Sequence, residues 1–177
     1  MRKLLTIFLT AIFLTLLAGA QVAAAQDQGK DKRAPSTPEE RKRFVNLTSK
    51  LIKSPLDEGL KDDAKWALQW LSDVPDVNVT PCPSPLGDLV PSDYRHAARI
   101  FSIYVLAMGV YAIEHPEKAE DETPQYLAGV EGALKAYKAI LKSKPGATSE
   151  DLDDLLAKQQ SGKLEAFVKT ASQECSK

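Results

Sequence analysis

The residues of this chain with the most distinctive chemistry are its two cysteines, Cys82 and Cys175. Two cysteines in an exported protein most often form one disulfide, because the compartment beyond the membrane is oxidising. The bond would close a loop of 93 residues (175 − 82), which corresponds to a stabilisation of about 4 to 5 kcal/mol. A free reactive thiol or a metal pair is the alternative, but the chain has no Cys-x-x-Cys motif and no histidine near either cysteine. We therefore expect a disulfide.

Two tryptophans, Trp66 and Trp70, are the candidate ligand-binding residues. They lie one helical turn apart and flank the apolar stripe of a predicted helix. Large rings at the edge of a buried face are suited to line a groove for a ligand or a peptide. The alternative is that both rings pack beneath the proline-rich segment that follows, because tryptophan is usually well buried.

The two histidines do not indicate a metal site. His96 and His115 are 19 residues apart, which corresponds to about 28 Å along a helix. They cannot share a metal ion within one chain, and His115 instead suits a cation at a helix C-terminus. We expect no metal and no cofactor.

Acidic side chains are numerous, but none lies in a recognisable catalytic or calcium-binding motif. The acidic stretches KDDAK (61–65) and EDLDD (150–154) lack the spacing of a calcium loop. The chain also has no glycine-rich phosphate loop and no Gly-x-Ser-x-Gly elbow. No catalytic residue is therefore assigned, and an enzyme would require Asp/Glu pairs assembled by the tertiary structure.

The N-terminal residues predict export. Arg2 and Lys3 precede an uncharged run rich in Leu, Ile and Phe, and Ala23 and Ala25 supply the small residues of a cleavage site. We expect residues 1–25 to be a signal peptide, which would place the protein in the periplasm or outside the cell. An uncleaved membrane anchor is the alternative, because the apolar run is only slightly shorter than a bilayer span.

Removal of residues 1–25 leaves 152 of the 177 residues, with 21 basic and 24 acidic side chains and a net charge of −3. This balance does not favour a nucleic-acid partner. The length suits one domain. We expect residues 26–36 to be a flexible leader and residues 37–177 to form a single helical domain.

Apolar side chains recur at helical spacing through most of this domain, and no alternating strand pattern occurs. Thr37 and Glu40 have the spacing of a capping box, and Thr148 with Asp151 resembles a second one. Ser54 before Pro55 and Thr123 before Pro124 mark two further helix starts, and Ser92 with Asp93 can cap the next helix. Five of the eleven prolines interrupt the pattern. The fold class is therefore all-α, a helical bundle or short helical-repeat-like array of about six helices. Four of the expected helices span residues 37–54, 55–74, 93–115 and 123–144, with a proline-rich loop at 75–91. Two shorter helices begin near residues 148 and 164, and the last one ends before Cys175.

The most apolar segment of the mature chain is the predicted helix 93–115. Its apolar part, residues 97–113, would be about 25 Å long, against about 30 Å for the hydrocarbon core of a bilayer. Arg99, Ser102 and Gly109 place a polar-to-small stripe along one side. We therefore expect the central core helix of the bundle and no membrane span in the mature chain.

One stretch, GALKAYKAILKSKPGATSEDLDDLLAKQ, resembles part of a tetratricopeptide helix pair, with Ala133, Tyr137 and Pro145 at the small, aromatic and helix-ending positions. A regular repeat is not supported, because the similar ending at AIEHPEKA is offset by 29 residues rather than about 34. The order of motifs along the whole mature chain is similar to that of small exported bacterial proteins of unknown function. That resemblance implies no activity.

Three functions remain compatible with these features. The first is a non-enzymatic exported helical protein that binds a peptide, a protein or a small apolar ligand. The second is an enzyme that uses Asp/Glu pairs, and the third is a structural component of the cell envelope. The sequence does not determine the oligomeric state.

Overall fold

The computed structural model describes residues 33–118 and 121–176, which belong to one compact unit. The predicted signal peptide and residues 26–32 of the predicted leader lie outside the described residues. Within these ranges the chain contains six α-helices and no strand, which confirms the all-α prediction. The helices are α2 (Pro38–Lys53), α3 (Lys61–Asp73), α4 (Ala97–Glu114), α5 (Glu122–Ser143), α6 (Glu150–Gln160) and α7 (Leu164–Ser172).

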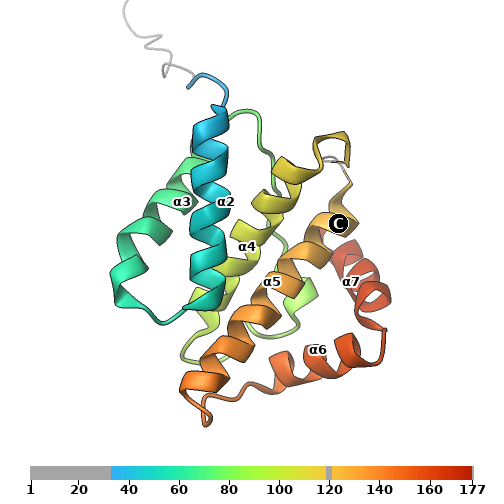
Figure 1. The fold of residues 1–177 in the computed structure, drawn as a ribbon. Helices are drawn as coiled ribbons and strands as arrows, with labels where there is room; N and C mark the ends of the chain where they lie inside the picture. Colours follow the sequence, from blue (N-terminus) through green and yellow to red (C-terminus); the bar gives the residue numbers. More distant parts are fainter. Residues whose placement is uncertain (1–32, 119–120, 177) are drawn as a thin grey trace, which may run out of the picture. The chain divides into compact units, whose positions relative to one another are not determined.

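Helices α4 and α5 pack against each other and form the centre of the domain (Figure 1). Helix α2 packs on both of them, and α3 packs on α2 and α4. On the other side, α7 lies against α5, and α6 joins α5 to α7. The bundle is therefore organised around α4 and α5.

Helix α4 is the central apolar helix that the sequence predicts, although it begins at Ala97 rather than at residue 93. By length and composition it is the one helix of the described ranges that could cross a membrane, with a mean hydropathy of 1.4 over 18 residues. In the domain, 56% of those residues are buried. A helix apolar on most of its circumference is typical of the core of a globular protein. The buried residues are Ala97, Ile100, Ile103, Tyr104, Leu106, Ala107, Met108, Gly109 and Ala112.

The start of α2 confirms the predicted capping box. The Glu40 amide donates to the Thr37 hydroxyl at 3.2 Å, and the Thr37 amide donates to the Glu40 carboxylate at 2.9 Å. The hydrogen bond from the Thr37 backbone and the nearby Arg33 guanidinium lower the pKa of Glu40. The orphan amides of the first turn are thus satisfied by local side chains.

Two of the other predicted helix starts are wrong by several residues. Ser54 is the C-cap of α2 rather than the N-cap of α3. Asp57 instead caps a short 3₁₀ turn, Glu58–Leu60, and α3 follows at Lys61. The Ser92 hydroxyl likewise donates to the Leu89 carbonyl at 2.7 Å in the turn before α4. Serine caps turns as readily as helices, so its position alone does not fix where a helix begins.

The predicted capping box at Thr148 and Asp151 does not form. The N-cap of α6 is Ser149, no side chain caps this helix, and the Asp151 carboxylate instead accepts from the Asp88 amide at 3.1 Å. The Ser149 amide, at the N-cap of α6, donates to the Tyr137 hydroxyl at 2.9 Å. The Tyr137 hydroxyl donates to the Asp153 carboxylate at 2.8 Å. The fully buried Tyr137 ring on α5 therefore positions the start of α6.

The proline-rich loop is part of the core. Val77, Cys82, Leu86 and Leu89 are each no more than 5% exposed. Cys82 and Cys175 lie at disulfide distance with their Cα atoms 6.0 Å apart, as predicted. The pair joins the loop to the segment that follows α7.

The last residues of the predicted leader contact the domain directly. Ser36 donates from its amide and its hydroxyl to Asp76, each at 2.8 Å. Arg41 forms an ion pair with Asp76 at 2.6 Å, and Arg33 forms one with Glu40 at 2.6 Å. The ordered domain therefore includes residues 33–36, upstream of the predicted boundary at residue 37.

Candidate functional site

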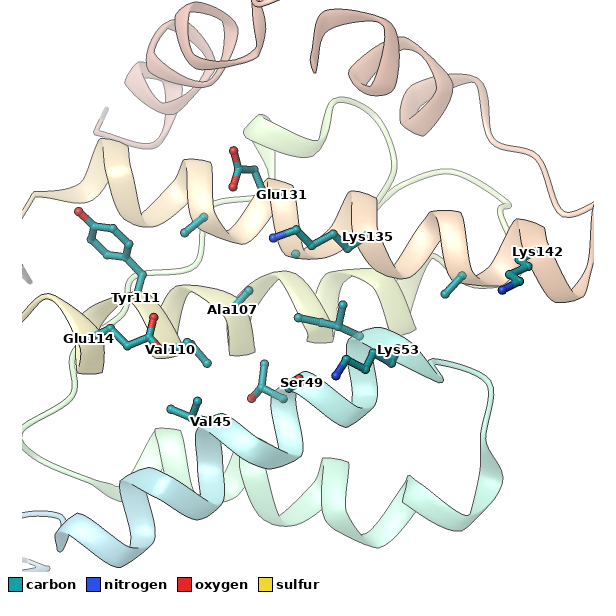
Figure 2. Close-up of a pocket in the computed structure, with 15 residues that line it drawn as sticks. Val45, Ser49, Lys53, Ala107, Val110, Tyr111, Glu114, Glu131, Lys135 and Lys142 are labelled. Atoms are coloured by element: carbon teal, nitrogen blue, oxygen red, sulfur yellow. The ribbon is translucent and has the colours of Figure 1, made fainter. Parts of the chain in front are cut away.

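A groove between α2, α4 and α5 is the candidate functional site (Figure 2). Its volume is 730 Å³, which lies in the range of about 300 to 1,000 Å³ that is usual for small-molecule pockets. Aliphatic side chains make up much of its lining. They are Val45, Ile52, Ala107, Val110, Ala128 and Ala139.

Small residues on α5 produce the hollow. Ala128, Gly132 and Ala139 recur at spacings of four and seven on the side of α5 that faces α2 and α4. A Cβ atom built on Gly132 would lie 2.5 Å from the Cβ atom of Ala107. The absence of a side chain at Gly132 thus lets α4 approach α5 closely, and the two alanines leave space above that contact.

Charged residues mark the two ends of the groove. Figure 2 shows Lys53 and Lys142 toward one end, Lys135 between the ends, and Glu114 at the other end. None of these four side chains forms an ion pair with the residues that the structure describes. The groove therefore has one basic end and one acidic end whose charges have no partner in the domain.

Two hydroxyl side chains lie in the α2 wall, between these ends. Thr48 is 1% exposed, and its hydroxyl oxygen has no hydrogen-bond partner in the described part of the chain. A buried hydroxyl without a partner costs about 1 to 3 kcal/mol. Ser49 is half-buried and also lines the groove. The α2 wall of the groove thus contains one buried hydroxyl group, that of Thr48, for which the described residues provide no hydrogen-bond partner.

A second hollow of 510 Å³ continues the groove at its basic end. It shares Lys53, Ala139 and Lys142 with the first and adds the apolar side chains of Pro55 and Leu56. Lys53 and Lys142 therefore lie at the junction of the two hollows.

The predicted tryptophan site lies elsewhere. Trp70 is 3% exposed and packs on Phe44, with 4.7 Å between the ring centroids. Its indole N–H has no hydrogen bond of ordinary geometry, although it lies near enough to Glu40 to help lower the pKa of that carboxyl group. The Trp66 ring is half-buried, 6.0 Å from Trp70, and the Arg43 guanidinium lies 3.8 Å from its centroid. These rings contact one another, α2 and the segment before α2, and neither lines the groove.

The histidines are separate, as expected. His115 is the C-cap of α4 and lies 3.9 Å from Glu117, at the helix end where a cation is favoured. His96 is at the other end of α4, and burial together with nearby Lys144 lowers its pKa. Among the described residues no group of three His, Cys, Asp or Glu side chains is arranged to hold a metal ion.

The carboxylates of the groove do not form an acid and base pair. Glu114 on α4 and Glu131 on α5 both line it. In Figure 2 the Glu131 side chain points away from Glu114. A further hollow of 420 Å³ is lined by Asp76, Glu117 and Asp121, but Asp76 is already bound to Ser36 and Arg41.

This groove was not predicted from the sequence, although the sequence contains one signal for it. Ala128, Gly132 and Ala139 form a row of small residues on the side of α5 opposite the buried tyrosines. Such a row indicates either a close helix contact or a hollow. The tertiary structure produces both, at different positions of the same row.

Comparisons with protein-family models, with curated proteins and with solved structures give no match to this chain. The resemblance to a tetratricopeptide helix pair and to small exported bacterial proteins therefore stays a prediction.

Proposed function

We propose that this protein is an exported, non-enzymatic binding protein that holds an elongated small ligand in the groove between α2, α4 and α5. One observation carries the proposal: the unpartnered, buried hydroxyl of Thr48 lies in the wall of a largely aliphatic groove. Buried polar groups are almost always paired in native proteins, so an unpaired one that lines a hollow favours a bound partner. The disulfide-distance cysteine pair supports a location in an oxidising compartment.

Titration with anilinonaphthalene sulfonate tests this proposal. The dye combines an aromatic body with one negative charge, which suits an aliphatic groove with lysines at one end. We expect a saturable rise in fluorescence with the wild-type protein. We expect Ala139→Trp to abolish it, because the indole would fill the junction of the two hollows.

The matched control is Ala157→Trp, which places the same side chain on an exposed position of α6. This variant should bind the dye as the wild type does. Ala139→Leu provides a smaller obstruction if the tryptophan variant unfolds, and circular dichroism checks the fold of each variant. The proposal is rejected if the wild type gives no saturable signal, or if the folded Ala139 and Ala157 variants bind the dye equally.

A further inference from the structure

The two ends of the groove differ in charge, and this polarity identifies the chemistry of the ligand. Glu114 at one end and Lys53 and Lys142 at the other are exposed and have no ion-pair partner among the described residues. A ligand that matches both ends carries a positive group at one end and a negative group at the other. A fatty acid, which has one charged end, matches only the lysines.

The length of the groove sets the distance between these two charges. Ala128 and Lys142 line opposite ends and lie 14 positions apart on α5 (142 − 128), which corresponds to about 21 Å at ~1.5 Å per residue. An extended peptide rises about 3.3 Å per residue, so about six residues span the groove. The volume of 730 Å³ suits a ligand of this size rather than a folded protein.

The middle of the groove suits a peptide backbone. The hydroxyl groups of Thr48 and Ser49 lie between the charged ends, among aliphatic side chains. Threonine in a helix has two accessible χ1 rotamers, so the Thr48 hydroxyl can turn to meet a partner in the groove. A peptide has an amide N–H and a carbonyl at each residue, whereas an acyl chain has no polar atom along its length. A peptide therefore gives the unpartnered Thr48 hydroxyl a hydrogen bond.

We infer that the groove binds a short, extended peptide of about six small, apolar residues with both ends free. Its N-terminal ammonium group lies at Glu114, and its C-terminal carboxylate lies between Lys53 and Lys142. This inference rests on the proposed function, since it names the ligand of the same groove. It predicts that binding depends on the free charges at the two ends of the peptide.

Calorimetric titration with four hexapeptides of alanine, valine and serine tests the inference. The peptides share one sequence and are free at both ends, N-acetylated, C-amidated or blocked at both ends. Each block should weaken binding about threefold, the effect of losing one exposed ion pair. For the double variant Lys53→Gln/Lys142→Gln, C-amidation should no longer weaken binding, whereas N-acetylation still should. For Glu114→Gln the reverse should hold: N-acetylation should no longer weaken binding, whereas C-amidation still should.

Two exposed charges on α7 provide matched controls, because Lys169→Gln and Glu165→Gln remove the same charges outside the groove. In both control variants, N-acetylation and C-amidation should weaken peptide binding as much as they do in the wild type. The inference is overturned if free and blocked peptides bind equally well. It is also overturned if a saturated fatty acid displaces the dye from the groove and the peptides do not, but that result leaves the proposed function intact. If the dye itself does not bind in the groove, the proposed function fails as well.

Discussion

Loss of the Cys82–Cys175 link is the perturbation whose effect the structure defines most clearly. The two residues are 93 positions apart. On the chain-entropy model, release of a loop of that length lowers the free energy of unfolding by about 4.6 kcal/mol at 25 °C. For a chain of this size that corresponds to a decrease in Tm of roughly 10 to 18 °C.

The structure also predicts which state of the protein changes. Leu86 and Leu89 are fully buried, and α7 packs against the 3₁₀ turn Ser84–Leu86. The Tyr104 hydroxyl donates to the Cys82 carbonyl at 2.8 Å, so the loop keeps its contacts with α4 when the bond is broken. The reduced protein should therefore retain its helical circular dichroism at 25 °C, and the loss should come from the greater freedom of the unfolded chain.

Urea denaturation with and without a phosphine reductant measures this effect. The variant Cys82→Ala/Cys175→Ala serves as the control, because the reductant should not change its stability. The reasoning is refuted if reduction leaves the urea midpoint of the wild type unchanged, or if the oxidised protein contains two free thiols by mass spectrometry. Loss of helical signal on reduction at 25 °C would show instead that the link holds the native loop in place.

Three further substitutions test the packing and the ion pairs. Gly132→Ala should lower the free energy of unfolding by about 1 kcal/mol, because its Cβ would meet an α4 side chain at 2.5 Å and the overpacking outweighs the gain in helix propensity. The control Gly146→Ala should be neutral or slightly stabilising, since no atom lies within 4 Å of a Cβ built at that position. Urea denaturation of the two variants checks these expectations. Tyr104→Phe should lower the free energy of unfolding by about 1 to 3 kcal/mol, because it leaves the buried Cys82 carbonyl without its hydrogen bond. An unchanged Tm in thermal melts would contradict this expectation. Burial raises the pKa of Asp76, but the hydrogen bonds from Ser36 and Arg41 outweigh it and lower the pKa overall. A lowered folded-state pKa means that the stabilisation is present above the unfolded pKa of about 4 and is lost as the pH falls through the folded value. Asp76→Asn should therefore destabilise at pH 7, and the loss should shrink as the pH falls below about 4. A loss that does not change with pH would argue against this ion pair.

The helices follow from local features of the sequence. The Thr37–Glu40 capping box and the apolar spacing of α2 and α5 are satisfied within a few turns of chain, so each can be inferred without knowledge of the rest of the fold. The starts of α3, α4 and α6 differ from the predicted ones because serine and threonine serve both turns and helices. The start of α6 is positioned by Tyr137 on α5, whose hydroxyl accepts a hydrogen bond from the Ser149 amide.

The candidate site depended on information that periodicity does not contain. Apolar spacing identifies which face of a helix avoids water, but not which neighbour covers that face. Trp66 and Trp70 have the composition of a binding site, yet α2 and two arginines cover them. The groove formed instead where small residues on α5 left space between three helices.

The amino-acid sequence by itself thus determined the helical class, the approximate helix positions and the pairing of Cys82 with Cys175. These properties depend on contacts between near neighbours or on there being only two cysteines. The tertiary structure alone decided that Thr48 is buried without a hydrogen-bond partner among the described residues, and that Glu114 lies at one end of a groove and Lys53 and Lys142 toward the other. The physical reason is that a groove is the space that the side chains of adjacent helices leave unfilled, and these helices come from separate parts of the chain.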